Sequence, residues 1–211
     1  MVRGGIFYPT FFIGGMMSKI EIINRALLKI GEPPIASLND VAFGQSYDMI
    51  YEDIKKLLLS TYPWRFAVQR KILARCAEQF GMRYKYHLPN NCLLLISVIG
   101  MVSTMTTDVH LTALQHYEIA DNAIVCDESN GIEIEYVADV EESCFPPLFR
   151  ETLIAKIASE ISMRLKHSIN FKQIFDNEFF NLIRQAELNN EIIKNAEILP
   201  DSSWVSVRQT W

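Results

Sequence analysis

Hydrophobic positions recur every three or four residues near the start of the chain, and this pattern stops abruptly at a pair of prolines. Ser18 followed by Glu21 forms a capping box, which satisfies backbone N–H groups in the first turn of a helix. Gly31 suits the left-handed residue that ends a helix, and Pro33 and Pro34 prevent continuation. The apolar stripe between these signals is Ile22, Ile23, Ala26, Leu27 and Ile30. The sequence predicts a helix that ends at a rigid elbow.

A second helix is predicted over residues 41–60, because apolar residues again recur at helical spacing. Its expected buried face consists of Tyr47, Ile50, Ile54, Leu57 and Leu58. Two helices joined by a short turn form a helical hairpin. Residues 17–62 are therefore predicted to be a hairpin that starts the folded part of the chain.

Strand-like patterns fill residues 63–145. They begin near Phe66. Trp64 lies just before them, at the transition from helix to strand, and is expected to be a core residue. The expected strands lie around residues 68–72, 84–86, 92–99, 123–126 and 132–137. Asn130 and Gly131 can both adopt positive φ, so the last two strands are predicted to form a hairpin. The middle of the chain is interpreted as a small antiparallel β module.

Helical spacing returns after Pro146 and Pro147, which favour the start of a helix. The apolar stripe of this third helix is Leu153, Ile157, Ile161 and Leu165. A fourth helix over residues 170–195 is expected to bury Ile174, Phe175, Phe179, Leu182, Ile183 and Ala186. The predicted fold class is therefore α+β: two N-terminal and two C-terminal helices (residues 146–199) form a bundle, with the β module inserted between them.

The two ends of the chain fall outside this pattern. Residues 1–16 are apolar but contain Pro9 and several glycines, and they are too short to span a bilayer, which needs about 20 apolar residues. They are interpreted as a disordered or mis-started extension, and no membrane segment is predicted. Residues 200–211 are an extended polar tail, in which Trp204 and Arg208 are candidate interface residues.

Composition indicates a globular protein, and the sequence matches none of the common enzyme motifs. Hydrophobic residues make up 49% and charged residues 21% of the 211 positions, as in globular proteins. The four cysteines are widely spaced, which indicates reduced thiols rather than a disulfide framework or a metal site. Glu133 and Glu135 share one strand face, but they alternate with apolar residues and are interpreted as the solvent side rather than an acid–base pair. No catalytic residue, cofactor or metal is predicted.

Charge is distributed unevenly along the chain. Residues 1–83 contain 11 Lys and Arg against 7 Asp and Glu, whereas residues 84–145 contain 1 against 10, and residues 146–211 contain 8 against 8. An acidic β module argues against a grip on DNA, because phosphate contacts require Lys and Arg. DNA can still pass nearby without specific binding.

The sequence resembles the tail tubular protein A family, the head-to-tail adaptors of short-tailed podophages. The resemblance covers almost all of residues 17–208. The segments that carry it are ALLKIGEPPIASLND, YPWRFAVQRKIL, YKYHLPNNCLLLISV, IEIEYVADV, FPPLFRETLIAKIASEIS and DSSWVSVR. It implies a virion structural protein, made in the host cytoplasm, that forms a dodecameric ring between the portal protein and the tail nozzle protein. The isolated chain is expected to be a monomer that awaits a template.

The resemblance suggests roles for two groups of residues. Gly31, Pro33 and Pro34 are candidate interface residues, because a rigid elbow gives helices a shape that can repeat around a ring. A candidate acidic surface lines the DNA channel or contacts the nozzle, or alternatively only keeps an exposed sheet soluble. Its members are Glu133, Glu135, Glu141 and Glu142. Two other function classes remain open, a tail-associated hydrolase and a small-ligand-binding host protein.

Overall fold

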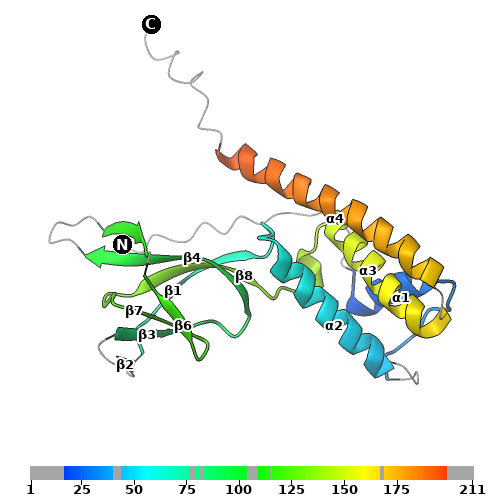
Figure 1. The fold of residues 1–211 in the computed structure, drawn as a ribbon, viewed down its shortest axis with the longest axis horizontal. Coiled ribbons are helices and arrows are strands. Elements are labelled where there is room, and N and C mark those ends of the chain that lie inside the picture. Colours follow the sequence, from blue (N-terminus) through cyan, green and yellow to red (C-terminus); the bar gives the residue numbers. More distant parts are fainter. Residues whose placement is uncertain are drawn as a thin grey trace, which may run out of the picture.

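The described part of the chain forms two lobes, one of helices and one of antiparallel strands (Figure 1). The computed structural model describes residues 17–39, 44–76, 79–80, 83–103, 109–114, 116–166 and 169–198. The helical lobe consists of α1 (Lys19–Lys29), α2 (Gly44–Thr61), α3 (Pro147–Lys166) and α4 (Ile169–Ile198). The predicted α+β class is confirmed, with two helices before the strands and two after them.

Helix α1 begins and ends at the predicted signals. Ser18 is the N-cap, and its hydroxyl and the Glu21 carboxylate form the expected capping box. At the other end, the Gly31 N–H donates to the Leu28 carbonyl and the Glu32 N–H donates to the Leu27 carbonyl. This pair of bonds is a Schellman motif, and Gly31 has the left-handed φ of 76° that the motif requires.

Helix α3 is the centre of the helical lobe, because α1, α2 and α4 all pack against it. Leu153, Ile157 and Ile161 are fully buried there, as predicted. In α2 the buried face is centred on Tyr51, Ile54, Leu58 and Leu59. Leu57 is 55% exposed, so its assignment to this face was wrong, as was that of Ile174 in α4, which is 58% exposed. The expected start of α2 at Val41 lies outside the described residues.

The β lobe consists of two four-stranded antiparallel sheets. The strands of the first sheet follow the order β1 (Val68–Leu73), β8 (Ile132–Ala138), β4 (Cys92–Ser103) and β5 (Val109–Ala113). The strands of the second sheet follow the order β2 (Gln79–Phe80), β3 (Arg83–His87), β7 (Ala123–Cys126) and β6 (Glu118–Ala120). Tyr86, Ile124 and Cys126 of the second sheet join Ile132 and Ile134 of the first in one apolar core. Each sheet therefore has a face covered by the other.

The predicted hairpin between residues 123–126 and 132–137 is wrong. These strands are β7 and β8, and they belong to different sheets. Gly131 does have a positive φ of 105°, but the two consecutive non-glycine residues with positive φ are Asp121 and Asn122. They link β6 to β7 as a two-residue turn, the type that matches the twist of paired strands.

An aromatic cluster holds the two lobes together. Trp64, Phe66, Phe145 and Phe149 form it, and Phe149 comes from the first turn of α3. The ring centroid of Phe149 lies 5.2 Å from Trp64, 4.9 Å from Phe66 and 5.0 Å from Phe145. Trp64 is 2% exposed, which confirms its core position, and its indole N–H donates to the Leu58 carbonyl of α2 at 2.7 Å.

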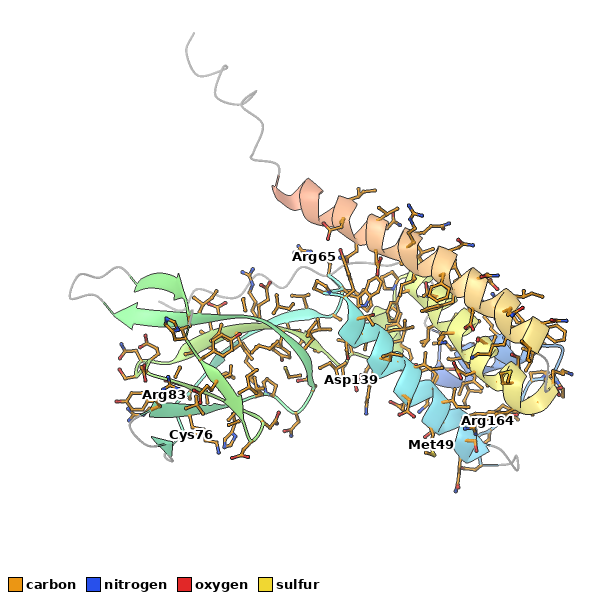
Figure 2. The ribbon with its side chains drawn as sticks, viewed as in Figure 1. Met49, Arg65, Cys76, Arg83, Asp139 and Arg164 are labelled. Carbon is orange, nitrogen blue, oxygen red and sulfur yellow. The ribbon has the colours of Figure 1, made fainter. Side chains whose placement is uncertain are left out.

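Polar contacts also join the two lobes, and Figure 2 labels two of the residues that make them, Arg65 and Asp139, in the region where the lobes meet. The Tyr51 hydroxyl of α2 donates to Glu142 Oε1 at 2.7 Å, and Lys55 Nζ lies 2.8 Å from Asp139 Oδ1. The Lys55 contact is an ion pair without hydrogen-bond geometry. From α4, Asn190 Oδ1 accepts from the Arg65 N–H at 2.8 Å. Helices α2 and α4 are thus both tied to the segments that enter and leave the β lobe.

Replacing Phe149 by Ala is expected to destabilise the protein by about 3 to 5 kcal/mol, because it removes a buried ring that contacts three other aromatic rings. The matched control is Phe180→Ala in α4, where the ring is 64% exposed and the expected change in the monomer is within about 0.5 kcal/mol. Urea unfolding followed by circular dichroism measures both. Equal losses in the two variants would contradict this account of the junction.

Gly31→Ala is expected to destabilise the protein by about 1 kcal/mol, because an alanine in the left-handed region brings its Cβ close to the following carbonyl. Apart from its chain neighbours, no described residue has an atom within 4 Å of the place that this Cβ would occupy, so the cost is one of backbone conformation alone. Gly31→Asn should cost less, since Asn tolerates this region better. Thermal unfolding should rank the wild type above the Asn variant and the Asn variant above the Ala variant; any other order contradicts the assignment.

Candidate functional site

The elbow residues predicted from the sequence lie on the surface at the end of α1. Gly31, Pro33 and Pro34 are exposed. The loop is fixed from inside by Asn24, whose side chain accepts from the Ile35 N–H at 2.8 Å and donates to the Ile35 carbonyl at 2.9 Å. The elbow is therefore accessible and held in one conformation, as an interface residue set would need to be.

The four predicted acidic residues do not all present free carboxylates. Glu135 pairs with Arg70 of β1 at 3.3 Å, and Glu142 accepts the Tyr51 hydroxyl at the junction. Burial and this bond raise the pKa of Tyr51 above its usual value. Glu133 faces the exposed Ile72 across the β1–β8 pair, and Glu141 is exposed just before the short 3-10 helix Glu142–Cys144. Trp204 and Arg208 lie outside the described residues.

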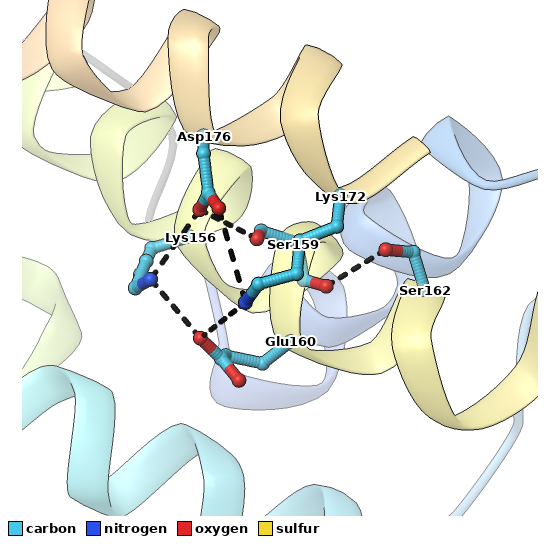
Figure 3. Close-up of polar contacts among 6 residues, drawn as sticks. All are labelled: Lys156, Ser159, Glu160, Ser162, Lys172 and Asp176. Atoms are coloured by element: carbon cyan, nitrogen blue, oxygen red, sulfur yellow. Dashed lines mark hydrogen bonds and ion pairs between the residues drawn. The ribbon is translucent and has the colours of Figure 1, made fainter. Parts of the chain in front are cut away.

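A polar network joins α3 to α4 (Figure 3). Ser159 Oγ donates to Asp176 Oδ1 at 2.7 Å, and Lys156 Nζ lies 3.0 Å from Glu160 and 3.4 Å from Asp176. Lys172 Nζ completes the network at 3.4 Å from Glu160 and 3.8 Å from Asp176. Four charges of balanced sign are therefore satisfied within one patch of the helix pair.

The chemistry of this network is that of a helix clamp rather than a catalytic centre. Burial raises the pKa of Asp176, but the Ser159 hydrogen bond and the charges of Lys156 and Lys172 outweigh it and hold that pKa below its usual value. A carboxylate with a lowered pKa is a weak base, and Ser159 is fully buried, so no substrate reaches its hydroxyl. The cluster offers no support for a hydrolase.

The other features of the described residues also give no support for small-molecule chemistry. No cluster of three or more His, Cys, Asp or Glu residues able to hold a metal is found within the described ranges. None of the helices in that part of the chain is long and apolar enough to cross a membrane. An open depression of about 380 Å³ lies between α1 and α3, lined by Arg25, Leu28, Lys29, Glu151 and Ile154.

The outer face of α4 is the most distinctive surface of the described residues. Of the 13 α4 side chains described as exposed, one is charged, six are amides and six are apolar. Five amides follow one another at intervals of four residues, which places them in one ridge along the helix. This amide ridge is Gln173, Asn177, Asn181, Gln185 and Asn189. Beside it runs an apolar ridge with the same spacing, Phe180, Arg184, Leu188 and Ile192.

Four charged residues of α4 lie instead on its flanks, where they have partners within the subunit. Glu178 pairs with Lys29 of α1, Glu191 accepts the Tyr62 hydroxyl, and Lys172 and Asp176 belong to the network with α3. The outer face is therefore nearly neutral because the charges of this helix are used within the subunit. Sequence reasoning missed the face by assigning Ile174 to the core. The repeating amides at intervals of four were the signal that could have revealed it.

Helix α2 also exposes a ridge, with the exposed Lys56 beside it. Its members again recur every four residues, and all are exposed: Gln45, Met49, Asp53, Leu57 and Thr61. Met49 is 66% exposed and Leu57 55% exposed. The ridge carries one charge, that of Asp53. Two helices of the lobe thus present large apolar side chains to solvent, which is typical of surfaces that contact other proteins.

Comparison of the sequence with protein-family models and with curated proteins found no match.

The Asp176 carboxylate is expected to make stability depend on pH. Its folded-state pKa is lowered, so its contribution is complete above the unfolded value, about 3.9, and is lost as the pH falls through the folded value. Asp176→Asn should therefore lower the free energy of unfolding at neutral pH and flatten its fall below about pH 4. Asp53→Asn, at an exposed position, is the matched control and should change neither. Urea unfolding at a series of pH values measures both; parallel curves for Asp176→Asn and wild type would contradict the clamp.

Proposed function

We propose that this chain is a phage or prophage virion structural protein, a head-to-tail adaptor that connects the portal to the tail nozzle. The resemblance to the tail tubular protein A family supports this proposal. So does the order of elements, since a helical lobe interrupted by a β lobe suits a subunit that packs through its helices and reaches a neighbour with its strands. In this role the protein has no catalytic activity and needs no cofactor.

The single observation that carries the proposal is the nearly uncharged outer face of α4. The chain as a whole has a net charge of −5, so two copies carry a net repulsion at long range. A face with six exposed apolar side chains, six amides and one charge is where close approach costs least. Depletion of charge with retained apolar and hydrogen-bonding groups is characteristic of the centre of protein interfaces.

The junction between the lobes supports the same proposal. An adaptor must keep its β lobe in a fixed orientation relative to the ring, because a flexible connection would let the DNA conduit lose its alignment. Here the aromatic cluster and the Lys55–Asp139 and Tyr51–Glu142 contacts join the lobes at several points. A rigid subunit also suits a closed ring, in which each rotation must be the same.

The acidic β segment fits a conduit for DNA without specific binding. Residues 84–145 contain 10 Asp and Glu against 1 Lys, and carboxylates prevent the counterion-releasing phosphate contacts that would hold DNA in place. Glu133 and Glu141, which make no ion pair with described residues, are the members of the acidic group best placed for this role. The tail with Trp204 and Arg208 is proposed to contact a neighbouring subunit or the nozzle protein.

Mixing the purified chain with the portal protein encoded in the same genome tests the proposal. Negative-stain electron microscopy is expected to show a ring bound to the portal, and native mass spectrometry is expected to give 12 copies, the stoichiometry that the family resemblance implies. A variant in which Leu188 and Ile192 are both Glu should fail to form this ring, while Leu28→Glu, at a similarly exposed leucine of α1, should form it. No assembly with the portal at any ratio or salt concentration would overturn the adaptor function.

A further inference from the structure

The exposed ridges of α2 and α4 are complementary in shape. On a helix surface, residues four apart form ridges, and two helices pack when the ridge of one enters the groove between two ridges of the other. The amide ridge and the apolar ridge of α4 lie side by side, three residues apart in sequence, and the groove between them is open to solvent. The α2 ridge is a single row with large side chains, Met49 and Leu57, flanking Asp53.

The two surfaces are also complementary in charge. The charge on the exposed face of α4 is the guanidinium of Arg184, and the charge on the α2 ridge is the carboxylate of Asp53, with the exposed Lys56 beside the ridge. Neither side chain makes an ion pair with another described residue. Each lies in the middle of its ridge, with an exposed leucine four residues away, Leu188 on α4 and Leu57 on α2. A contact between the ridges would pair the two charges and bury the apolar side chains beside them.

The positions of α2 and α4 exclude this contact within one chain. Both helices pack on α3, and Figure 1 shows them on opposite sides of it. The residues of both ridges are exposed to solvent, so they are not packed against each other within one chain. A subunit with complementary surfaces on opposite sides can join identical subunits head to tail. Such heterologous contacts produce a closed ring when the rotation between subunits divides a full turn.

We propose that the α2 ridge of one copy of this chain packs into the groove between the amide ridge and the apolar ridge of α4 in the next copy. Asp53 then lies against Arg184 and within reach of the amide donors, while Met49 and Leu57, on either side of Asp53, lie against Phe180 and Leu188, on either side of Arg184. Packing of two rows of this kind sets the helices at about −50° to one another. The place of this contact in a ring rests on the proposed function. The contact itself is inferred only from the two exposed surfaces.

Two variants that each block one surface test the contact. Met49→Glu disables the α2 ridge, and Leu188→Glu disables the α4 groove. All the positions are exposed, so the subunit fold is expected to persist, which circular dichroism checks. Leu28→Glu, outside both ridges and 59% exposed, is the matched control. Sedimentation velocity is measured for each chain alone and for an equal mixture of the two variants, from about 10 μM to about 1 mM, the range of weak protein association.

Wild type and Leu28→Glu are expected to be monomers at the low end of this range and to form oligomers as the concentration rises, whereas each blocking variant alone stays a monomer throughout. The mixture is expected to form a 1:1 heterodimer and nothing larger, because one intact ridge meets one intact groove. A mixture that stays monomeric while wild type associates would overturn the contact. Dimers of either blocking variant alone, or a wild-type chain that is monomeric throughout, would also overturn it.

Charge reversal tests the pairing of Asp53 with Arg184. Asp53→Arg alone and Arg184→Asp alone should each weaken association about threefold to tenfold, as expected for an exposed pair turned into a repulsion. The chain that carries both substitutions should recover most of the loss. A double variant no better than the single ones would overturn the pairing.

The outcomes separate this contact from the adaptor function. Rings assembled on the portal by a chain that carries both Met49→Glu and Leu188→Glu would overturn the α2–α4 contact and leave the adaptor function standing. A heterodimer in the mixture, together with no ring on the portal from wild type, would support the contact and overturn the function.

Discussion

The packing of Phe149 against Trp64 and Phe66 is the interaction on which the arrangement of the two lobes depends. Phe149 belongs to the first turn of α3, while Trp64 and Phe66 lie in the segment that leaves α2 for the β lobe. One set of rings therefore fixes the start of the C-terminal helices against the end of the N-terminal ones. The β lobe enters and leaves at this point, where the Ala138 N–H also donates to the Ala67 carbonyl at 2.8 Å. Without the cluster, the lobes would be joined mainly by the polar contacts around it, such as those of Lys55 with Asp139 and Tyr51 with Glu142.

The helix ends could be predicted from the sequence because their signals are local. Ser18, Glu21 and Gly31 act through hydrogen bonds to residues at most four positions away, so their role does not depend on the rest of the fold. The predictions of the buried helix faces were less accurate. On α2 the residues Tyr47, Tyr51, Ile54 and Leu58 all lie within one narrow arc, and Leu57, although also apolar, is turned well away from it. The spacing of apolar residues alone could not show that this leucine is exposed.

The topology of the sheets could not be predicted from local pattern, since strands β7 and β8 are both apolar and close in sequence. A two-residue turn at Asp121 and Asn122 closes β6 onto β7, whereas the longer loop of residues 127–131 lets the chain cross to the other sheet. Both loops contain residues that accept positive φ, so turn chemistry allows either pairing. What decides is the shared core, to which Ile124 and Ile132 contribute from different sheets. The pattern of hydrophobic residues along the chain carries no information about such non-local packing.

The candidate interaction surface follows from how α4 uses its charges. This helix has charged residues at Lys172, Asp176, Glu178 and Glu191, and each has a partner on its own subunit. An ordinary solvent-facing helix distributes charges over its outer side for solubility, and here that side has Arg184 alone among the described exposed residues. Internal pairing secures α4 to α1 and α3, which keeps the two outer ridges straight and fixed before any partner arrives. A preorganised surface loses little conformational freedom on binding, so a modest contact area can support association when many identical contacts act together around a ring.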